Sequence, residues 1–599
     1  MRCLLKALSV MSLRASLRRP CQLCRWSSTA QALFSYELMK QQYRPEVPEY
    51  FNFASDVLDR WTEVEKEGKK PKNPALWWVD GDGEEVRWSF EELGMLSRKA
   101  ANVLSDACGL QRGDRVLLLL PRIPEWWLLN VACMRTGTVP IPGTQQLTAK
   151  DILYRLQKSK AKGIITDDSV ASTVESVEAD CQSLRFKLLV SEGHREGWLS
   201  FKNLLKNAPS DHRCVTTKSQ HPIAIYFTSG TTGAPKMTEH SHCSYGIGLT
   251  VSGRYWLNLT SSDIYWNTSD TGWAKAAWSV FSAWSQGACV FVHKMPQFSP
   301  PAVFESLSRY PITVFCSAPT AYRMLVQHQL PSCTFNSLQH CASAGEPINP
   351  EVMAEWKART GLDIHECYGQ TETVLVCGNF KGMEIKPGSM GKPSPAYDVK
   401  IIDENGNILP PGKEGEIAIR VKPTRPLFLF TCYTDDPKKT EATVRGDFYV
   451  TGDRGIMDED GYFWFVGRAD DVINSAGYRI GPFEVESALI EHPAVVESAV
   501  VSSPDPIRGE VVKAFVVLTP DYVSHDPEKM MKELQDHVKK ATAPYKYPRK
   551  SCQKPLVGRS EEMNYARRNG GDTRIRWFLG CVVLTLGMGS GGFLLCLFA

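Results

Sequence analysis

The stretch Thr228-Ser-Gly-Thr-Thr-Gly-Ala-Pro-Lys236 is the segment around which the rest of the chain is best interpreted. It follows an apolar run, Ala224–Phe227, of the kind that forms β-strands, so we expect a loop that leaves a strand. Its glycines permit tight turns and close approach to a ligand, and its hydroxyl groups and lysine suit phosphate oxygens. The spacing and the missing Ser or Thr after the lysine exclude a Walker A loop. By itself the stretch could equally be an ordinary polar turn between two strands.

Length and composition limit the class of protein. A chain of 599 residues is too long for one compact core, which predicts at least two domains. A net charge of +3 argues against a dedicated nucleic-acid binder. The 18 cysteines are scattered, and several lie in apolar runs (Cys133, Cys289, Cys316), which indicates reduced core cysteines and no disulfide framework. Cys21 and Cys24 have no second pair nearby, so we expect no zinc site.

The N-terminal segment, residues 1–36, has six Arg or Lys residues and no acidic residue before Glu37. Serines and leucines are interspersed, and arginines interrupt any apolar run that a secretory signal would need. This composition is typical of a mitochondrial transit peptide, and a disordered basic tail is the alternative.

The pattern of strands and helices predicts the architecture. In residues 45–469, apolar strand-like runs such as Arg115–Leu120 alternate with helical stretches such as Asp151–Ser159. This alternation is typical of an α/β fold, here a large N-terminal domain of layered, largely parallel sheets. From about Tyr397 short strands and turns follow, which predicts a β-rich subdomain. Residues 470–550 then read as a small, mobile α+β C-terminal domain, truncated relative to a complete one.

The last part of the chain differs in character. Residues 551–576 form a polar tail without clear periodicity, and residues 577–599 contain no charged side chain. Twenty-three residues are long enough for a transmembrane helix, and Arg574 and Arg576 flank one end. An apolar extension without a membrane role is the alternative, and the sequence leaves both open.

Several polar loops fall at the ends of predicted strands. These are Trp266–Trp273, Ser343–Pro347 and Glu366–Glu372. Because ligands of open α/β sheets bind at the carboxyl ends of the strands, we expect these loops to cluster around one site. Each loop alone would more often be an ordinary surface turn, so the prediction depends on their occurring together.

The order of four motifs identifies a family. With Thr228–Lys236, Tyr368–Glu372, Tyr449–Asp453 and Gly467–Asp471 in sequence, the chain resembles the adenylate-forming enzymes. This superfamily includes acyl-CoA synthetases, firefly luciferase and the adenylation domains of peptide synthetases. Over about residues 45–550 the chain is similar to the mammalian mitochondrial medium-chain acyl-CoA synthetases (butyrate–CoA ligases). The stretches that carry this similarity are Pro124–Trp127, Ser269–Trp273, Tyr478–Pro482, Ser503–Glu510 and Thr542–Lys550.

The resemblance implies a two-step reaction with ATP, Mg²⁺ and coenzyme A (CoA). A carboxylate attacks the α-phosphate of ATP to give an acyl-adenylate and diphosphate, and the thiol of CoA then displaces AMP. Because carboxylate and triphosphate are both anionic, the first step needs charge neutralisation and positioning. The implied partners are therefore a small carboxylic acid, ATP and CoA, without nucleic acid.

The family motifs assign the ATP side of the site. Lys236, Thr371 and Glu372 are the implied catalytic residues, and Glu372 would also hold Mg²⁺, which prefers oxygen ligands. Tyr368 would lie against adenine, opposite Gly345–Pro347, and Asp453 would bind the ribose hydroxyls. The implied ATP-binding residues are Thr228, Ser229, Gly230, Thr231, Thr232, Gly233, Ala234, Pro235, Lys236, Glu366, Cys367, Tyr368, Gly369, Gln370, Thr371, Asp453 and Arg468.

The same resemblance assigns the second step. In this family the small domain rotates about a hinge aspartate, here Asp470, to bring a new face to the site. The implied CoA-binding residues are Gln146, Ala476, Gly477, Tyr478, Arg508, Tyr547, Pro548 and Arg549. Thr371, Arg479, Trp266 and Trp273 are the implied contacts of the acyl substrate, although surface arginines and core aromatics are the ordinary alternatives.

The chain departs from the family in two places. Cys367 stands where glycine is frequent, and its Cβ could crowd the nucleotide or require an unusual φ. The family also ends in a Gly-Lys segment whose lysine reaches the reacting carboxylate and α-phosphate. Near residue 564 this chain has Glu561–Tyr565 instead, and no Gly-Lys follows Lys550. Loss of that cation predicts severely reduced adenylation.

Two functions from different classes therefore remain. The first is a medium-chain fatty acid–CoA ligase in the mitochondrion, most plausibly in the matrix. The second is a non-catalytic binder of ATP or acyl-CoA, tethered to a membrane by residues 577–599. A peptide-synthetase adenylation domain is a weaker third, since no carrier motif follows. Acyl length, use of benzoate-type acids and oligomeric state stay open.

Overall fold

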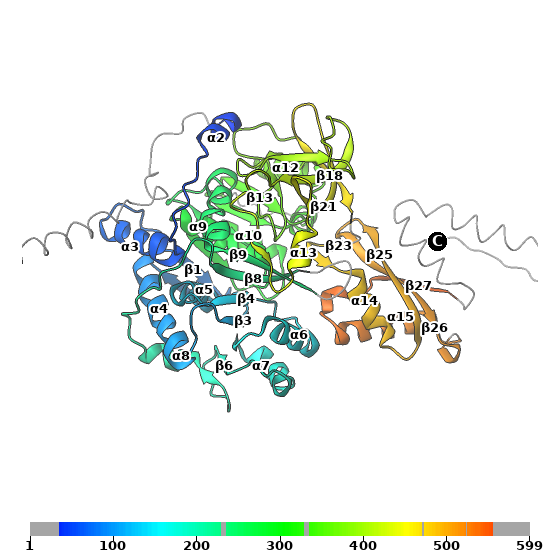
Figure 1. Ribbon diagram of the computed structural model, residues 1–599, viewed down its shortest axis with the longest axis horizontal. Helices are drawn as coiled ribbons and strands as arrows, with labels where there is room; N and C mark the ends of the chain where they lie inside the picture. Colours follow the sequence, from blue (N-terminus) through cyan, green and yellow to red (C-terminus); the bar gives the residue numbers. More distant parts are fainter. Residues whose placement is uncertain (1–34, 229–234, 329–334, 470–471, 523, 555–599) are drawn as a thin grey trace, which may run out of the picture.

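The computed structural model describes residues 35–228, 235–328, 335–469, 472–522 and 524–554 (Figure 1). Parallel sheets with helices packed on them form the large N-terminal part, and a smaller sheet with two long helices lies at one side of it. The predicted mixed α/β fold with a large and a small domain is confirmed.

The central sheet has the strand order β16–β15–β14–β13–β12–β10–β11–β1–β2. The strands from β14 to β1 run parallel, and β2, β15 and β16 are antiparallel additions at the two edges. All residues of the inner strands β10, β11, β12 and β13 are buried, as expected inside a parallel sheet. The bounds are β1 (Leu76–Val79), β2 (Glu85–Trp88), β10 (Ile264–Asn267), β11 (Cys289–His293), β12 (Val314–Ser317), β13 (His340–Ala344), β14 (Ile364–Tyr368), β15 (Cys377–Gly378) and β16 (Lys392–Pro393).

A second sheet, with the order β4–β3–β5–β6–β7, is parallel throughout. Its strand β4 contains two prolines and lies at the edge, where a missing backbone N–H is tolerated. The bounds are β3 (Arg115–Leu119), β4 (Val139–Pro142), β5 (Gly163–Thr166), β6 (Phe186–Leu189) and β7 (Leu199–Ser200). Beside it, β8 (Pro222–Thr228), β9 (Lys236–Ser241) and β19 (Cys432–Tyr433) form an antiparallel sheet.

Local signals in the sequence set the helix boundaries. Ser89 with Glu92 and Thr148 with Asp151 form capping boxes at the starts of α4 and α6. Helix α5 ends at Gly137, whose φ of 71° suits glycine. The bounds are α3 (Asp59–Lys66), α4 (Phe90–Asn102), α5 (Pro124–Thr136), α6 (Ala149–Ser159), α7 (Asp168–Glu175), α8 (Phe201–Asn207), α9 (Phe281–Ser285), α10 (Pro300–Arg309), α11 (Pro319–Gln327), α12 (Pro350–Thr360) and α13 (Pro437–Glu441).

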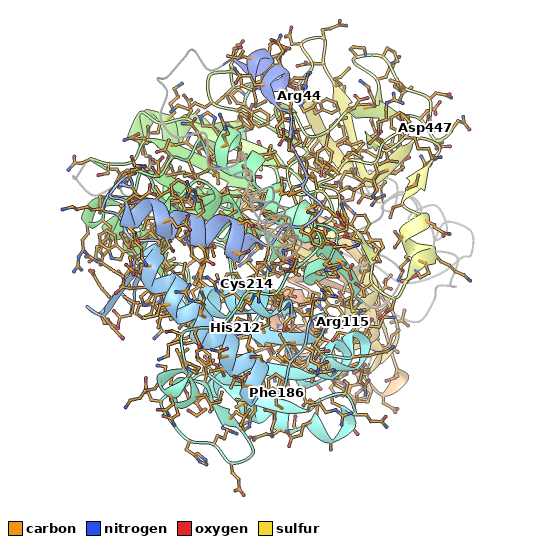
Figure 2. All side chains as sticks on the ribbon, turned by 60° about the vertical axis from the view of Figure 1, so that its left-hand side comes forward. Arg44, Arg115, Phe186, His212, Cys214 and Asp447 are labelled. Carbon is orange, nitrogen blue, oxygen red and sulfur yellow. The ribbon has the colours of Figure 1, made fainter. Side chains whose placement is uncertain are left out.

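The predicted β-rich subdomain is present between the central sheet and the small domain. Its antiparallel strands are β17 (Val399–Ile402), β18 (Glu414–Arg420), β20 (Val444–Arg445), β21 (Phe448–Met457) and β22 (Phe463–Arg468). Arg115 at the start of β3 pairs with Asp435, with 3.2 Å between Nη1 and Oδ2, and so ties the second sheet to the segment after β19 (Figure 2).

The small domain, residues 473–554, is built on the sheet β24–β23–β26–β25 with β27 parallel to β26. Leu534 and Val538 on one face of α15 pack into its apolar core. Strand β27 extends four residues into the predicted polar tail because its backbone pairs with β26. The bounds are β23 (Ile473–Ser475), β24 (Tyr478–Ile480), β25 (Val495–Asp505), β26 (Gly509–Leu518), β27 (Lys550–Lys554), α14 (Pro482–Ile490) and α15 (Pro527–Ala541).

The first described helix, α2 (Tyr36–Gln42), overlaps the end of the predicted transit peptide. The Tyr36 hydroxyl donates to the Pro393 carbonyl at 2.8 Å, and Met39 is buried. In Figure 2 this helix, with Arg44 just beyond it, packs at the same end of the molecule as Asp447. Tyr36 is therefore part of the folded body, and residues 1–34 lie outside the described residues.

Two further predictions can be compared with the structure. Within the described ranges, no helix is both long and apolar enough to cross a membrane. The segment 577–599 lies outside these ranges, so its membrane role stays a prediction. Cys133, Cys289 and Cys316 are buried free thiols, as their apolar surroundings in the sequence predicted.

Candidate active site

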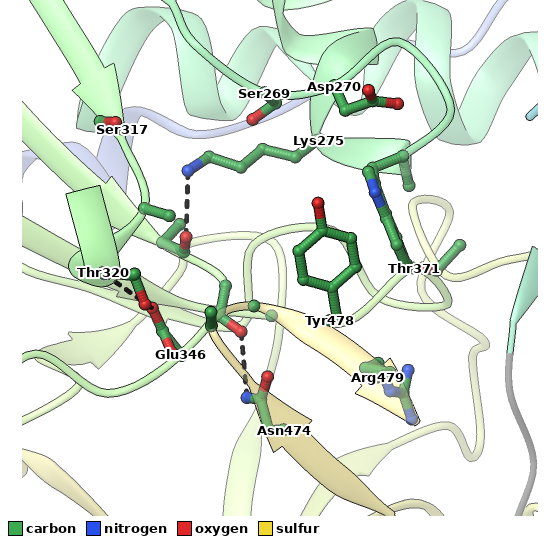
Figure 3. Close-up of a pocket in the computed structure, with 18 of the residues that line it drawn as sticks. Ser269, Asp270, Lys275, Ser317, Thr320, Glu346, Thr371, Asn474, Tyr478 and Arg479 are labelled. Carbon is green, nitrogen blue, oxygen red and sulfur yellow. Dashed lines mark hydrogen bonds between the residues drawn. The ribbon is translucent and has the colours of Figure 1, made fainter. Parts of the chain in front are cut away.

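A cavity of about 640 Å³ lies between the loops of the large domain and the small domain (Figure 3). The loops after β10, β12, β13 and β14 converge here because parallel strands end at the same edge of the sheet. Of the predicted residues, those that line the cavity are Gln146, Thr228, Trp273, Glu366, Cys367, Tyr368, Gly369, Gln370, Thr371, Asp453, Arg468, Ala476, Gly477, Tyr478, Arg479 and Arg508.

The predicted phosphate loop connects two antiparallel strands, β8 and β9, whose ends Thr228 and Lys236 face each other. Residues 229–234 lie outside the described residues, so the structure is silent on Ser229, Gly230, Thr231, Thr232, Gly233 and Ala234. Lys236 does not line the cavity; its Nζ lies 4.9 Å from the centre of the Tyr433 ring. The carbonyl of Pro235 accepts a hydrogen bond from the Tyr154 hydroxyl at 3.1 Å.

Glu372 lies just behind the cavity wall, 3% exposed. Its Oε1 accepts a hydrogen bond from the Tyr433 hydroxyl at 3.0 Å, and its Oε2 lies 3.7 Å from Nη1 of Arg479. Burial works against ionisation, but the positive charges of Arg479 and Lys236 outweigh it and lower the pKa of Glu372. The side chain is therefore a buried carboxylate held beside two cations.

His240 fixes the backbone beside this carboxylate. Its Nε2 donates to the Thr371 carbonyl at 2.6 Å, and its Nδ1 accepts from the Ser244 hydroxyl at 2.9 Å. Burial lowers the pKa of His240 to about 4, so the ring is neutral at neutral pH. His240 was not predicted from the sequence, because a single histidine in a strand gives no signal until its contact with Thr371 is known.

Three side chains, Tyr368, Gln370 and Arg468, donate to or pair with the Asp453 carboxylate. Its Oδ2 accepts hydrogen bonds from the Tyr368 hydroxyl and, at 2.7 Å, from Nε2 of Gln370, while Arg468 pairs with Oδ1. The carboxylate is 3% exposed, and its geometry is fixed before any ligand arrives. A fixed carboxylate of this kind, paired with an arginine, suits two neighbouring hydroxyl groups of a ligand.

Glu366 and Cys367 lie at the end of β14. Burial raises the pKa of Glu366 to about 8, and the nearby Glu346 carboxyl adds to this rise, while the Ile348 N–H and Arg323 oppose it. Within the described residues, Oε2 of Glu366 has no hydrogen-bond partner. Cys367 has an ordinary strand conformation opposite Gly378, so the expectation of an unusual φ at this position is wrong.

The small domain contributes the hairpin β23–β24, whose turn at Ala476 and Gly477 has positive φ values of 52° and 81°. This turn carries Tyr478 and Arg479 into the cavity (Figure 3). Tyr547, Pro548 and Arg549 are not among the lining residues. Nη1 of Arg549 donates to the Tyr547 hydroxyl at 2.5 Å, outside the cavity wall. The hinge candidate Asp470 lies outside the described residues.

The two predicted acyl-pocket tryptophans differ in position. Trp273 lines the cavity and packs edge-on against Tyr478, with 5.4 Å between ring centres. Trp266 is in β10, 1% exposed, between Phe291 and Phe315 of the neighbouring strands. It does not line the cavity, because its side chain points to the helix-covered face of the sheet, and it is corrected to a core residue.

The cavity also contains polar residues that the sequence analysis missed. Lys275, in the short 3₁₀ helix η7 (Ala274–Ser279), donates from Nζ to the Ala344 carbonyl at 3.0 Å (Figure 3). Asn474 of the small domain donates to the Gly345 carbonyl at 3.2 Å. Lys275 follows Trp273 by two positions, and this closeness to a motif loop was the signal in the sequence that could have predicted it.

The donor groups of the described residues decide whether they could hold Mg²⁺. They contain no cluster of three or more His, Cys, Asp or Glu side chains that could hold a metal alone. Glu372 is an ionised carboxylate whose Oε2 has no hydrogen-bond partner in the described part of the chain. Mg²⁺ often binds one or two carboxylates together with substrate phosphates and water, and Glu372 fits that role.

Comparison with known proteins identifies the family. The sequence profile of the AMP-binding enzyme matches residues 64–429, and that of the AMP-binding enzyme C-terminal domain matches residues 484–554. The chain is 69% identical over 525 residues to the mitochondrial acyl-coenzyme A synthetase ACSM3 of Mus musculus, covering 88% of this chain and 90% of the relative. It is 64% identical over 504 residues to the mitochondrial acyl-coenzyme A synthetase ACSM5 of Homo sapiens, covering 84% and 87%.

Solved structures agree with these sequence matches. An acyl-CoA synthetase of Brucella canis is 33% identical, with a TM-score of 0.66 over 87% of this chain and 95% of the other. The anthranilate CoA ligase AuaEII, in complex with anthranoyl-AMP, is 27% identical, with a TM-score of 0.65 over 87% and 98%. Because the profile of the AMP-binding enzyme matches more than half of the chain, and relatives at 64% and 69% identity cover more than four fifths of it, the chain belongs to the AMP-binding enzyme family.

Proposed function

We propose that the chain is an acid–thiol ligase that converts ATP, a medium-chain carboxylic acid and CoA to acyl-CoA, AMP and diphosphate. The observation that carries the proposal is the shared cavity, in which Thr371 and Asp453 of the large domain face Tyr478 and Arg479 of the small domain. High identity to acyl-coenzyme A synthetases over most of the chain supports the same reaction.

On the large domain, Asp453 binds the ribose hydroxyls and Tyr368 lies against the adenine. Lys236 and the residues from Thr228 onward hold the β- and γ-phosphates. Glu372 would hold Mg²⁺, which when bound neutralises phosphate charge. Thr371, held by His240, is positioned to contact the α-phosphate and the acyl carboxylate.

The small domain supplies the second step. Ala476, Gly477, Tyr478 and Arg508 of the small domain line the cavity. We assign this opening, with Gln146 on the large domain, to CoA, whose phosphate groups favour Arg508. Trp273 and Tyr478 form an aromatic wall where the acyl group and the thiol meet.

The first step is impaired in this chain, because no lysine replaces the family's final one in the sequence after Lys550. Of the residues assigned to the second step, those that line the cavity are Gln146, Ala476, Gly477, Tyr478 and Arg508. The chain would therefore transfer an acyl group from a supplied acyl-adenylate to CoA faster than it makes the adenylate from ATP.

Location follows from the relatives, which are mitochondrial. We place the chain in the mitochondrion, and in the matrix if residues 577–599 do not insert in a membrane. The alternative is a tethered, non-catalytic binder of ATP or acyl-CoA, favoured only by the missing lysine and the uncharged segment. Carbonate extraction of mitochondria separates the two: the tethered form stays in the pellet.

A paired assay tests the function. Diphosphate exchange with butyrate, octanoate or benzoate measures the first step, and acyl-CoA formation from supplied octanoyl-adenylate measures the second. We expect weak exchange and clear thioester formation, with the mouse relative as the active reference. Exchange equal to the reference contradicts the impairment, and failure of both steps contradicts the ligase and favours the non-catalytic binder.

A further inference from the structure

The segment Ala344–Pro347 connects the two domains through its carbonyl groups. Lys275 holds the first of them from the large domain, and Asn474 of the small domain donates to the second, at Gly345 (Figure 3). Gly345 has a φ of 111°, a conformation that disfavours other residues. One face of the segment lines the cavity, and we call this segment the clamped loop.

Arg323 of helix α11 extends the connection. Its Nη2 donates to the last carbonyl of the clamped loop, at Pro347, with a distance of 2.9 Å. Its Nη1 donates to the Ile507 carbonyl of the small domain at 3.0 Å. Ile507 immediately precedes Arg508, which lines the cavity, so one guanidinium bridges the clamped loop and the turn that carries a CoA candidate.

Contacts within the large domain also hold Arg323. Its Nε donates to Oδ1 of Asn349 at 2.9 Å, and Nη1 lies 3.6 Å from Oε1 of Glu346. The side chains of this pair are only 5% and 2% exposed. Glu346 is held in turn by the Thr320 N–H at 2.7 Å. Because a buried charge must stay paired, these contacts of the large domain orient the guanidinium that reaches the Ile507 carbonyl.

We propose that the clamped loop couples the two ligand sites, with Asn474 and Arg323 as positioning residues: a nucleotide that orders the loop strengthens docking of the small domain and thereby binding of CoA. The inference rests on the proposed function, which places adenine against Gly345–Pro347. A ligand that packs against this segment restricts the same backbone whose carbonyls accept hydrogen bonds from Asn474 and Arg323, so the entropy cost of ordering the loop is met once for both ligands.

Thermodynamic linkage makes the proposal measurable. If AMP tightens CoA binding by some factor, CoA must tighten AMP binding by the same factor. Coupling between sites is typically about 5-fold to 150-fold. Two hydrogen bonds cross between the domains here, from Asn474 to the Gly345 carbonyl and from the charged Arg323 to the Ile507 carbonyl, and this number suits the lower part of that range.

The experiment titrates CoA into the full chain by calorimetry, with and without saturating AMP. For the unaltered chain we expect AMP to lower the Kd of CoA about fivefold or more. In Asn474→Ala the factor falls toward one. In Arg323→Lys a cation still faces Glu346, but one ammonium cannot donate to the carbonyls of both Pro347 and Ile507 in the same geometry. The factor by which AMP tightens CoA binding should therefore fall in this variant too. The matched control is Arg359→Met, because among the described residues the hydrogen bonds of Arg359 go to Glu355 and the His328 carbonyl, both in the large domain.

Each outcome of the CoA titrations either supports or contradicts the coupling between the two ligand sites. Binding of both ligands without coupling in the unaltered chain overturns the inference and leaves the proposed function standing. Coupling that survives in both variants, or that is lost equally in Arg359→Met, also overturns it. Absence of AMP and CoA binding in the unaltered chain overturns the proposed function itself.

Discussion

Arg479 of the small domain reaches Glu372 of the large domain, with 3.7 Å between Nη1 and Oε2. Glu372 is 3% exposed, and neither of these two atoms has a hydrogen-bond partner in the described part of the chain. The two charges are thus paired at a distance that leaves room for adjustment when anionic phosphates or a cation enter. The same contact places the β23–β24 hairpin of the small domain against Glu372 of the large domain.

Glu372→Gln should remove the magnesium dependence of ATP binding. The amide keeps the shape but loses the negative charge that suits Mg²⁺, while Arg479 remains to attract phosphate. We expect ATP affinity in the unaltered chain to be at least about tenfold higher with Mg²⁺ than with a chelator, and the variant to show little difference. Calorimetric titration measures this, and a variant with undiminished magnesium dependence contradicts the assignment.

Asp453→Ala should abolish discrimination between AMP and 2′-deoxy-AMP. A charged acceptor to a hydroxyl contributes about 1.5–3 kcal/mol, so the unaltered chain should bind AMP at least about tenfold more tightly than the deoxy analogue. The variant should bind both equally weakly. If the variant still binds AMP more tightly than 2′-deoxy-AMP, the ribose hydroxyls bind to a residue other than Asp453.

Substitution of Trp266 should mainly lower stability, whereas substitution of Trp273 should mainly weaken CoA binding. Trp266→Ala removes a large buried side chain and should lower the free energy of unfolding by about 3–5 kcal/mol. Trp273→Ala, at the cavity, should cost much less stability but weaken CoA binding, because its packing against Tyr478 positions the hairpin. Urea unfolding and CoA titration of both variants test the pair; equal destabilisation would contradict the distinction.

Glu366 should make stability depend on pH. Its folded-state pKa of about 8 exceeds its ordinary value of 4.5, so between these values the folded chain keeps a proton that the unfolded chain releases. The unfolded state then binds fewer protons, and the free energy of unfolding must fall as pH rises through this window, by at most about 1.4 kcal/mol per unit. It levels off above the folded-state pKa.

The matched variant for this effect is Glu366→Gln, which cannot titrate. The difference in unfolding free energy between the unaltered chain and the variant should shrink or reverse from pH 5 to pH 8 in urea titrations. A constant difference across this range would mean that Glu366 is ionised in the folded state at neutral pH.

Local signals in the sequence were sufficient for much of the fold. Ser89 with Glu92, Thr148 with Asp151 and the glycine after Thr136 act within one helical turn, so they predict helix ends without tertiary information. The motif order predicted the family for the same reason, since each motif is contiguous. Strand β27 escaped prediction because parallel pairing to β26 gives no local pattern.

The sequence alone determined the α/β class, the family and the identity of many cavity residues, because these reside in contiguous motifs and in periodicity. Only the tertiary structure separated Trp266 from Trp273, which look alike in one loop but face the core and the cavity. Only the structure brought His240 to Thr371 and Arg323 to Ile507, which lie 131 and 184 positions apart. Contacts between distant residues arise from how the layers pack, and no local pattern of side chains encodes them.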